Sequence, residues 1–324
     1  MGGARFSPHR PARKDIKDEK KSKLTRNILN RWQLYLLLLL PLIYVILFKY
    51  VPMVGNILAF KKYEVGKSIW DMEWVGLANF KRFFANYKFS QIIKNALTLA
   101  LYNVIVTFPI PILFALFINA FPGRRYKKVV QTVTYIPHFF STVVVVGIIL
   151  QILNNRTGLY GNLYMLITGQ SAPNILTNGP LFKHIYVWSA VWQSTGYSAI
   201  IYIAALSNVD SSLHEAAKID GANRRQNMWH IDLPSILPTA SIMLILAIGG
   251  IMSMGYEKIL LLQNDLNLTY SEVISTYEYK VGFASGITDF SLSTAISMFN
   301  SVINLILLVI ANWGSKKLGG NGIF

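Results

Sequence analysis

Residues 212–235 form the longest well-patterned polar segment of a sequence that is otherwise rich in apolar runs. Ser212 and Glu215 stand three positions apart, which is the spacing of a capping box at the start of a helix. In such a box, each of the two residues satisfies a backbone amide of the other. Gly221 can adopt the left-handed conformation that ends a helix, so a short helix is expected before it.

A second short helix is expected to follow directly. Asn223 is a favourable N-cap, the helix would run through Trp229, and Pro234 would stop it. Apolar stretches of membrane length flank the whole segment on both sides. A helix–glycine–helix projection between two membrane spans favours docking into a partner.

Sequence signals for catalysis and for cofactor binding are lacking. The chain has no G-x-x-x-x-G-K-[ST] loop to cradle phosphates, no G-x-S-x-G turn for a nucleophilic serine and no H-E-x-x-H metal motif. It contains no cysteine, which excludes disulfides, thiol catalysis and thiolate metal sites. The five histidines are scattered: His9, His138, His184, His214 and His230. We therefore expect no catalytic residue, no metal site and no cofactor bound by this chain.

The polar segment resembles the EAA loop of the permease subunits of ATP-binding-cassette importers. The resemblance is carried by Glu215, Ala216, Ala217, Asp220, Gly221, Ala222, Ile231, Leu233 and Pro234. It implies that these residues couple the chain to an ATPase. The alternative is a surface helical hairpin whose carboxylates are merely solvated. The complete set at this spacing, placed between two spans, favours the permease.

Composition independently indicates an integral membrane protein. Of 324 residues, 53% are hydrophobic and 14% are charged, against roughly 25% charged residues in soluble domains. Several apolar runs approach the ~20 residues that a bilayer span requires. The net charge of +16 would suit nucleic acid, but the basic residues lie mostly in short segments between spans. This pattern is typical of a membrane protein that follows the positive-inside rule, and it argues against a nucleic-acid partner.

We predict an all-α protein with six transmembrane helices and the fold of a type I importer permease. The expected spans are approximately 33–53, 95–120, 129–153, 185–206, 237–262 and 294–313. The expected organisation is a basic tail (1–32), a first span with outer loop and interfacial helix (33–94), a core permease domain (95–313) containing the coupling loop (207–236), and a C-terminal tail (314–324).

The distribution of charge predicts the orientation. Six spans place both termini on the same side, together with the basic tail, residues 124–128, the coupling loop and the pair Lys316 and Lys317. Basic loops face the cytoplasm, so both termini are expected there, in the bacterial cytoplasmic (inner) membrane. The tail either lies on anionic membrane lipid or is a solvated disordered segment.

Three loops are expected on the outer side. Residues 54–94 contain Asn79–Phe84, whose aromatic and basic side chains suit a helix lying in the membrane interface. Residues 154–184 are predicted to be loop, and residues 263–293 to form a short helix. The string Trp74–Phe80 also resembles a W-V-G-L-x-N-F stretch of carbohydrate importer permeases; an aromatic belt is the alternative.

The spans carry neutral polar and aromatic residues of the kind that bind sugars. These are Asn95, Asn103, Gln151, Trp188, Trp192, Gln193, Ser194, Tyr197, Ser253, Tyr256, Asn300 and Asn304. Alternatively they bond neighbouring helices or anchor at the interface. The run from Val187 to Tyr197 resembles the span before the EAA loop in permeases of the maltose-transporter type.

That resemblance implies a substrate path containing Gln193 and Tyr197, with Trp192 beside them, and Gly250 and Met254 on the next span. Gly250 and Met254 replace the polar residues of the maltose system, so maltose itself is not expected. The whole string resembles the subgroup that imports complex or acidic oligosaccharides, alginate importers among them. The net-positive first outer loop suits a polyanionic substrate.

Charged residues are nearly absent from the spans. Glu257 and Lys258 lie near the outer end of the predicted fifth span and are expected to snorkel. Ion-coupled transporters usually place carboxylates deep in their spans, and this sequence shows none there. An ion-coupled transporter and a permease for peptides or amino acids nevertheless stay as alternatives to an oligosaccharide permease.

The resemblance also implies a set of partners. An importer of this type uses two permease chains, so a second homologous permease is expected to form a heterodimer with this one. Two ATP-binding-cassette subunits would bind ATP and Mg, and an extracytoplasmic solute-binding protein would deliver the oligosaccharide. The chain itself would be a non-catalytic subunit that works by alternating access.

Overall fold

The computed structural model describes residues 31–253, 255–284, 286 and 288–317. They form helices joined by turns and loops, with an isolated antiparallel bridge between Lys61 and Trp74. The all-α prediction is therefore confirmed. Most of the predicted basic tail and most of the predicted C-terminal tail lie outside these residues. The chain divides into two compact units, Met1–Ile57 and Leu58–Phe324.

The first unit contains one long apolar helix. α2 (Trp32–Val45) continues through a π-helical segment, η1 (Ile46–Tyr50), into α3 (Val51–Met53). Leucine and other apolar residues surround α2 on all sides, as expected of a helix in lipid, and none of its side chains is buried. Together with η2 (Val54–Phe60), these segments form a helical stretch of 29 residues, Trp32–Phe60, that is long and apolar enough to cross a membrane. This agrees with the predicted first span.

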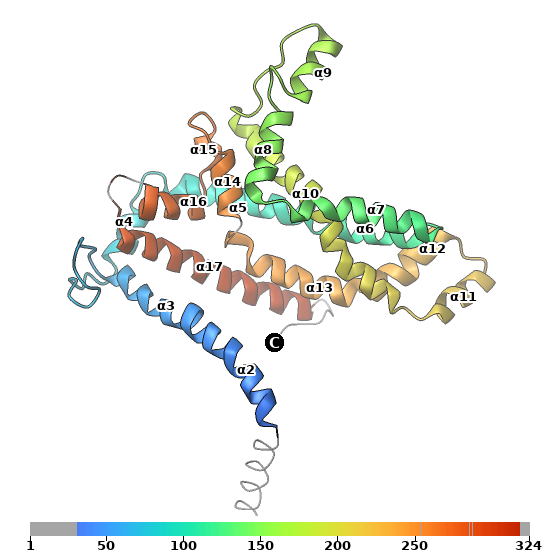
Figure 1. Ribbon diagram of the computed structural model, residues 1–324, viewed down its shortest axis with the longest axis horizontal. Helices are drawn as coiled ribbons and strands as arrows, with labels where there is room; N and C mark the ends of the chain where they lie inside the picture. The colour runs from blue at the N-terminus through green and yellow to red at the C-terminus, as the bar shows by residue number, and fades with distance from the viewer. Residues whose placement is uncertain (1–30, 254, 285, 287, 318–324) are drawn as a thin grey trace, which may run out of the picture. The chain divides into compact units, whose positions relative to one another are not determined.

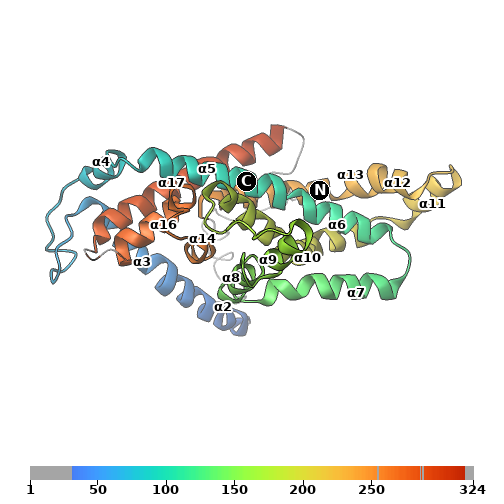
Figure 2. The same ribbon diagram turned by 90° about the horizontal axis from the view of Figure 1, so that it is seen from above.

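The second unit contains three further helical stretches of this kind among the described residues. They are built from α5 (Phe89–Thr107) with α6 (Pro109–Ala120), from α13 (Leu233–Gly249) with the short helices before it, and from α17 (Phe290–Lys317). The fourth predicted span lies within α10 (Gly179–Ser207). At 29 residues α10 is about 43 Å long, enough to cross the hydrocarbon, although its sequence is more polar. It packs against α5, α6 and α13 (Figures 1 and 2).

The predicted third span is broken, so the expectation of one continuous helix over 129–153 is wrong. α7 (Arg124–Tyr135) runs into a short 3-10 turn, η3 (Ile136–Phe139), and meets α8 (Thr142–Ile152) at an angle of 102°. Pro137 lacks the amide that a continuing helix needs. Ser141 then starts α8 afresh, because its hydroxyl accepts a hydrogen bond from the Val144 amide.

The predicted fifth span is shorter than expected. α13 ends at Gly249, and η5 (Ile251–Ser253) and α14 (Tyr256–Leu262) follow instead of a continuous helix to residue 262. Two consecutive glycines weaken a helix at this point. Gly249 also permits close packing on α17, since a Cβ there would lie 2.5 Å from the Leu308 side chain.

The segments predicted to lie on the outer side are more ordered than the sequence indicates. α4 (Ala78–Phe84) confirms the predicted helix, but it is packed rather than merely interfacial, because Phe83 is buried and Asn79 donates to the carbonyls of Ala59 and Lys61. The predicted loop 154–184 contains α9 (Leu159–Thr168) and the start of α10. The expected short helix in 263–293 is confirmed by α15 (Leu268–Ser271), α16 (Ile274–Tyr279) and η6 (Lys280–Ala284).

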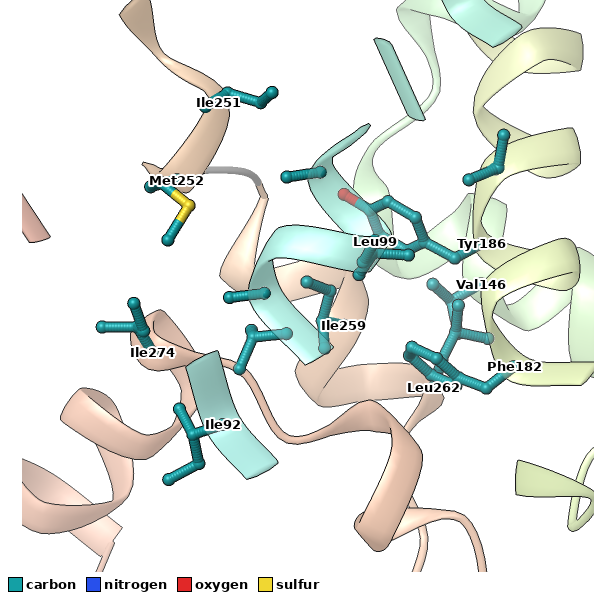
Figure 3. Close-up of a cluster of buried hydrophobic side chains, with 14 of the residues drawn as sticks. Ile92, Leu99, Val146, Phe182, Tyr186, Ile251, Met252, Ile259, Leu262 and Ile274 are labelled. Carbon is teal, nitrogen blue, oxygen red and sulfur yellow. The ribbon is translucent and has the colours of Figure 1, made fainter. Parts of the chain in front are cut away.

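Buried aliphatic and aromatic side chains join these elements into one core. Ile92 and Leu99 of α5, Val146 of α8, Tyr186 of α10 and Ile259 of α14 lie together in this cluster (Figure 3). The cluster explains why α14 folds against the other helices, because the apolar face of α14 packs on α8 and α16. η5 and α14 are too short to be stable alone, so their packing into this cluster stabilises them.

Lys258 is the exception in this core. Its side chain is only 7% exposed, and its Nζ forms no hydrogen bond within the described part of the chain. The ammonium group lies over the Tyr186 ring, 5.4 Å from the ring centre. Burial lowers the pKa of Lys258 to about 8. The expected snorkelling of Lys258 is therefore wrong, because α14 turns it inward, while Glu257 is exposed.

We predict that Lys258→Met stabilises the protein most at neutral pH. A lysine whose pKa falls from 10.5 in the unfolded chain to about 8 in the fold opposes folding while it is charged, by up to roughly 3 kcal/mol. This cost is complete below pH 8 and disappears as the pH rises toward 10.5. Melting temperatures of the purified protein at pH 7 and pH 10 measure it. Exposed Lys62 gives the control, Lys62→Met; a gain from Lys258→Met that is equal at both pH values would contradict the prediction.

Candidate coupling site

The first helix of the polar segment is α11 (Ser211–Ile219), and it begins two residues earlier than the predicted capping box would place it. Asp210, not Ser212, is the N-cap: its carboxylate accepts a hydrogen bond from the Ser212 amide at 2.9 Å. The predicted capping box between Ser212 and Glu215 is therefore wrong, because Asp210 accepts the hydrogen bond from the Ser212 amide that Glu215 would accept in such a box. The hydrogen bonds from Ser212 also lower the pKa of Asp210.

The predicted end of α11 at Gly221 is confirmed. Gly221 has a φ of +79°, in the left-handed region. The Ala222 amide donates to the Ala217 carbonyl at 2.8 Å, and the Gly221 amide donates to the Lys218 carbonyl at 3.2 Å. This pair of bonds is a Schellman motif, which satisfies the last carbonyls of a helix and depends on a residue that tolerates positive φ.

The second helix starts as predicted but does not stop where predicted. Asn223 caps α12 (Arg224–Asn227) through a capping box with Gln226, with N···O distances of 3.0 and 2.8 Å. α12 then continues through a π-helical segment, η4 (Met228–Asp232), into α13. Pro234 falls in the first turn of α13, directly after this wider turn, where a missing amide is tolerated.

The segment exposes both charged and apolar side chains on the surface of the protein. Glu215, Ala216, Asp220, Gly221 and Pro234 are exposed, whereas Ala217, Ala222, Ile231 and Leu233 are half-buried. Ile219 is 86% exposed, and Leu213 and Trp229 are also exposed. α11 lies at one end of the second unit, beyond α12 (Figure 1). Exposed apolar side chains beside carboxylates favour contact with another protein.

A buried carboxylate ties this loop to the membrane helices. Asp232 is 4% exposed. Its Oδ1 lies 2.9 Å from His214 Nε2 on α11, and its Oδ2 accepts a hydrogen bond of 3.3 Å from Asn119 Nδ2 on α6. The Asn119 carbonyl in turn accepts a hydrogen bond of 2.8 Å from Lys127 Nζ on α7. This His214–Asp232 link therefore connects α11 to α6, α7 and the start of α13.

The predicted substrate-path residues are only partly brought together. Tyr197 is exposed and stacks on His138 of η3, with ring centres 3.7 Å apart and an angle of 5° between the ring planes. Gln193 lies one turn earlier on α10, half-buried, and Trp192 is exposed. Gly250 is exposed at the end of α13. Met254 lies outside the described residues.

A cavity of about 270 Å³ lies between α5, α6, α10 and α13; its lining is mainly apolar but includes four polar side chains, and we call it the polar cavity. Its polar lining comes from Asn103, Thr107, Ser198 and Tyr202, and Asn103 Oδ1 is buried without a hydrogen-bond partner among the described residues. Gln193 and Tyr197 do not line it. Asn103 was among the polar residues singled out from the sequence, but Ser198 and Tyr202 were not. These two stand four apart on α10, and that spacing was the signal that could have found them.

A family match and close relatives cover most of this chain. Residues 107–319 match the family described as binding-protein-dependent transport system inner membrane component. Over 309 residues the chain is 41% identical to the polygalacturonan/rhamnogalacturonan transport system permease protein YteP of Bacillus subtilis (strain 168), and the match covers 95% of each chain. The coupling site falls inside both matches.

Two solved structures share the fold. A bacterial ABC transporter involved in the import of the acidic polysaccharide alginate aligns with a TM-score of 0.82 and 36% identity, over 91% of this chain and 99% of the other. The bacterial alginate ABC transporter in complex with an alginate pentasaccharide-bound periplasmic protein aligns with a TM-score of 0.84 and 35% identity, over 93% and 100%.

We predict that His214→Ala loosens α11, because it leaves the buried Asp232 with one hydrogen bond fewer. Losing a partner of a buried charged group costs about 1–3 kcal/mol. Hydrogen–deuterium exchange of the purified protein should show faster exchange of the α11 amides. His230 provides a matched control, since its ring contacts the Gln226 carbonyl of its own helical segment. Equal exchange in His214→Ala and His230→Ala would show that the His214–Asp232 link does not hold the loop.

Proposed function

The chain belongs to the family of binding-protein-dependent transport system inner membrane components, and from this we infer that it passes an acidic oligosaccharide through the bacterial inner membrane. It is the permease subunit of an ATP-binding-cassette importer. The observation that carries the choice of substrate is the likeness to the alginate importer over nearly the whole of both chains. Similarity to YteP, named for polygalacturonan and rhamnogalacturonan transport, supports the same class.

The proposed assembly has five chains. This chain pairs with a second, similar permease, and two ATPase subunits bind ATP and Mg on the cytoplasmic side. A periplasmic binding protein, such as accompanies the alginate importer, delivers the sugar. The bond-breaking chemistry belongs to the ATPases, and the permease supplies a path that faces each side of the membrane in turn.

We place the contact with one ATPase on α11 and its surroundings. Leu213 and Ile219 offer exposed apolar surface, and Glu215 and Asp220 flank it with charge. Such a mixed surface suits a groove on another protein. When the ATPases close, the docked helix would move, and the His214–Asp232 link would pass this movement to α6, α7 and α13. This route explains why a carboxylate is buried at the base of the loop.

The sugar path is assigned to the polar cavity and to the residues around the break between α7 and α8. Ser198 and Tyr202, which line this cavity, both carry hydroxyl groups. Gln193, Tyr197, Trp192 and Gly250 stay part of the proposal, together with Met254. The stacked rings of Tyr197 and His138 give a flat surface of the kind on which a sugar ring can pack.

The orientation follows from the basic segments. Residues 124–128 and the coupling loop would face the cytoplasm, and residues 154–184 the periplasm, with both termini inside. The chain contains no cysteine, so single cysteines at positions 126 and 170 can report it. An impermeant maleimide should label only position 170 in intact spheroplasts. Labelling at position 126 alone would contradict the proposed orientation.

Uptake by the assembled transporter tests the function directly. The two permeases and two ATPases, reconstituted in proteoliposomes with the binding protein outside the vesicle and ATP inside, should accumulate radiolabelled uronate oligosaccharides. Omission of ATP or of the binding protein should abolish accumulation. If the wild-type assembly accumulates neutral oligosaccharides but no uronate oligosaccharide, the proposed substrate class is wrong.

We predict that Gly221→Leu weakens coupling to the ATPases. A side chain in the left-handed conformation costs about 1–2 kcal/mol, and it would project from the docking surface. Substrate-stimulated ATP hydrolysis should fall, while membrane insertion is unchanged. The matched control is Gly169→Leu, because Gly169 ends α9 with a φ of +70° and, like Gly221, has open space within 4 Å of the position that a Cβ would occupy. Normal stimulated hydrolysis in Gly221→Leu would remove the docking role from this turn.

A further inference from the structure

Two lysines meet at the end of α10 that lies farthest from α11. Lys183 Nζ donates a hydrogen bond to Thr98 Oγ1 of α5 at 2.5 Å. Lys94 stands one helical turn before Thr98 on the same face of α5, and Thr98 Oγ1 donates to the Lys94 carbonyl at 2.7 Å, so Thr98 contacts both lysines. Among the described residues, neither lysine forms an ion pair with a carboxylate.

Neighbouring basic residues behave differently. Arg82 pairs with Asp289 at 2.9 Å, and Lys280 and Lys88 lie 3.1 and 3.6 Å from the buried carboxylate of Glu272. Two cations that repel each other without a counter-ion are unfavourable, and an anion placed between them would relieve this repulsion. The lysine pair of α5 and α10 is therefore arranged to receive an anion from outside the chain.

The next turns of the same two helices carry groups suited to a sugar. Tyr102 Oη lies 2.9 Å from His184 Nδ1 and accepts a hydrogen bond of 3.1 Å from Trp188 Nε1. Trp188 is 55% exposed. Together with Trp192 and His184, it borders a cavity of about 460 Å³ whose other walls are mainly aliphatic. The indole rings thus offer apolar faces beside polar groups.

We propose that Lys94 and Lys183 bind a carboxylate group of an acidic oligosaccharide, whose sugar rings then pack on Trp188 and Trp192. Ammonium groups form charge-assisted hydrogen bonds with carboxylates, and the apolar face of a sugar ring packs on aromatic side chains. This inference rests on the proposed function and assigns residues to the recognition of its substrate class.

The position of the pair on α10 fits the mouth of the path. From Lys183 to Ser207 the helix rises about 36 Å, which exceeds the ~30 Å of the hydrocarbon. With α11 in the cytoplasm, the lysine pair lies at the periplasmic end. There it could meet the uronate groups that the binding protein releases.

The test is uptake of a uronate oligosaccharide by the complete reconstituted transporter at saturating loaded binding protein. The double variant Lys94→Met/Lys183→Met should reduce uptake roughly tenfold, the effect of losing a charge-assisted hydrogen bond. The double variant Lys94→Arg/Lys183→Arg keeps both charges and should retain most of it. Lys316→Met, which removes an exposed lysine near the end of α17, should leave uptake unchanged.

Three outcomes would overturn the inference. If wild type transports the uronate and the double Met variant does so equally well, the lysines bind no substrate. If the double Met variant binds the loaded binding protein more weakly by the same factor, the lysines form a protein-docking surface instead. If the Arg variant fails as badly as the Met variant and both melt lower, the lysines serve only packing. Failure of wild type to transport any uronate would instead reject the proposed function, and this inference with it.

Discussion

Hydrocarbon offers no water to backbone amides and carbonyls, so a membrane-spanning chain must satisfy these groups itself. Where this chain leaves the helical conformation, side chains replace the lost bonds. Between α13 and α14, the Met252 amide donates to Asn304 Oδ1 at 3.0 Å, and the Met252 carbonyl accepts from Asn300 Nδ2 at 3.3 Å. At the start of α8, the Ser141 hydroxyl accepts from the Val144 amide. Each break depends on a partner placed opposite it.

This requirement changes which polar residues can belong to the sugar path. Asn300 and Asn304 resemble sugar-binding residues when only the sequence is considered, yet both are engaged with the backbone of η5. Asn95 likewise donates to the Thr269 and Glu272 carbonyls. Their amides stabilise irregular backbone, so the path must draw on other groups. Asn103, whose Oδ1 has no partner within the described residues and which lines the polar cavity, is free to serve the proposed path.

The sequence allowed prediction of the features that depend on near neighbours. The turn at Gly221 and the cap at Asn223 involve bonds that reach no more than five positions along the chain, so residue type and spacing suffice. The His214–Asp232 link could not be predicted, because its partners are 18 positions apart and the contact to Asn119 spans 113. Hydropathy located the long apolar helices, but it averages over a window and therefore missed the breaks at Pro137 and Gly250. Pro137 was a signal that could have marked the first of them.

α7 contacts both the proposed coupling site and the proposed sugar path. Near its start, Lys127 donates to the Asn119 carbonyl beside Asp232. Near its other end, the Thr134 carbonyl packs so closely on Gly196 of α10 that a Cβ there would lie 2.3 Å from it. The following turn, η3, places His138 on Tyr197. Coupling between distant sites needs contiguous packed elements, and α7 is one rigid helix with a contact at each end. A displacement of α11 that reached Lys127 would therefore arrive at the Tyr197 stack without crossing a flexible loop.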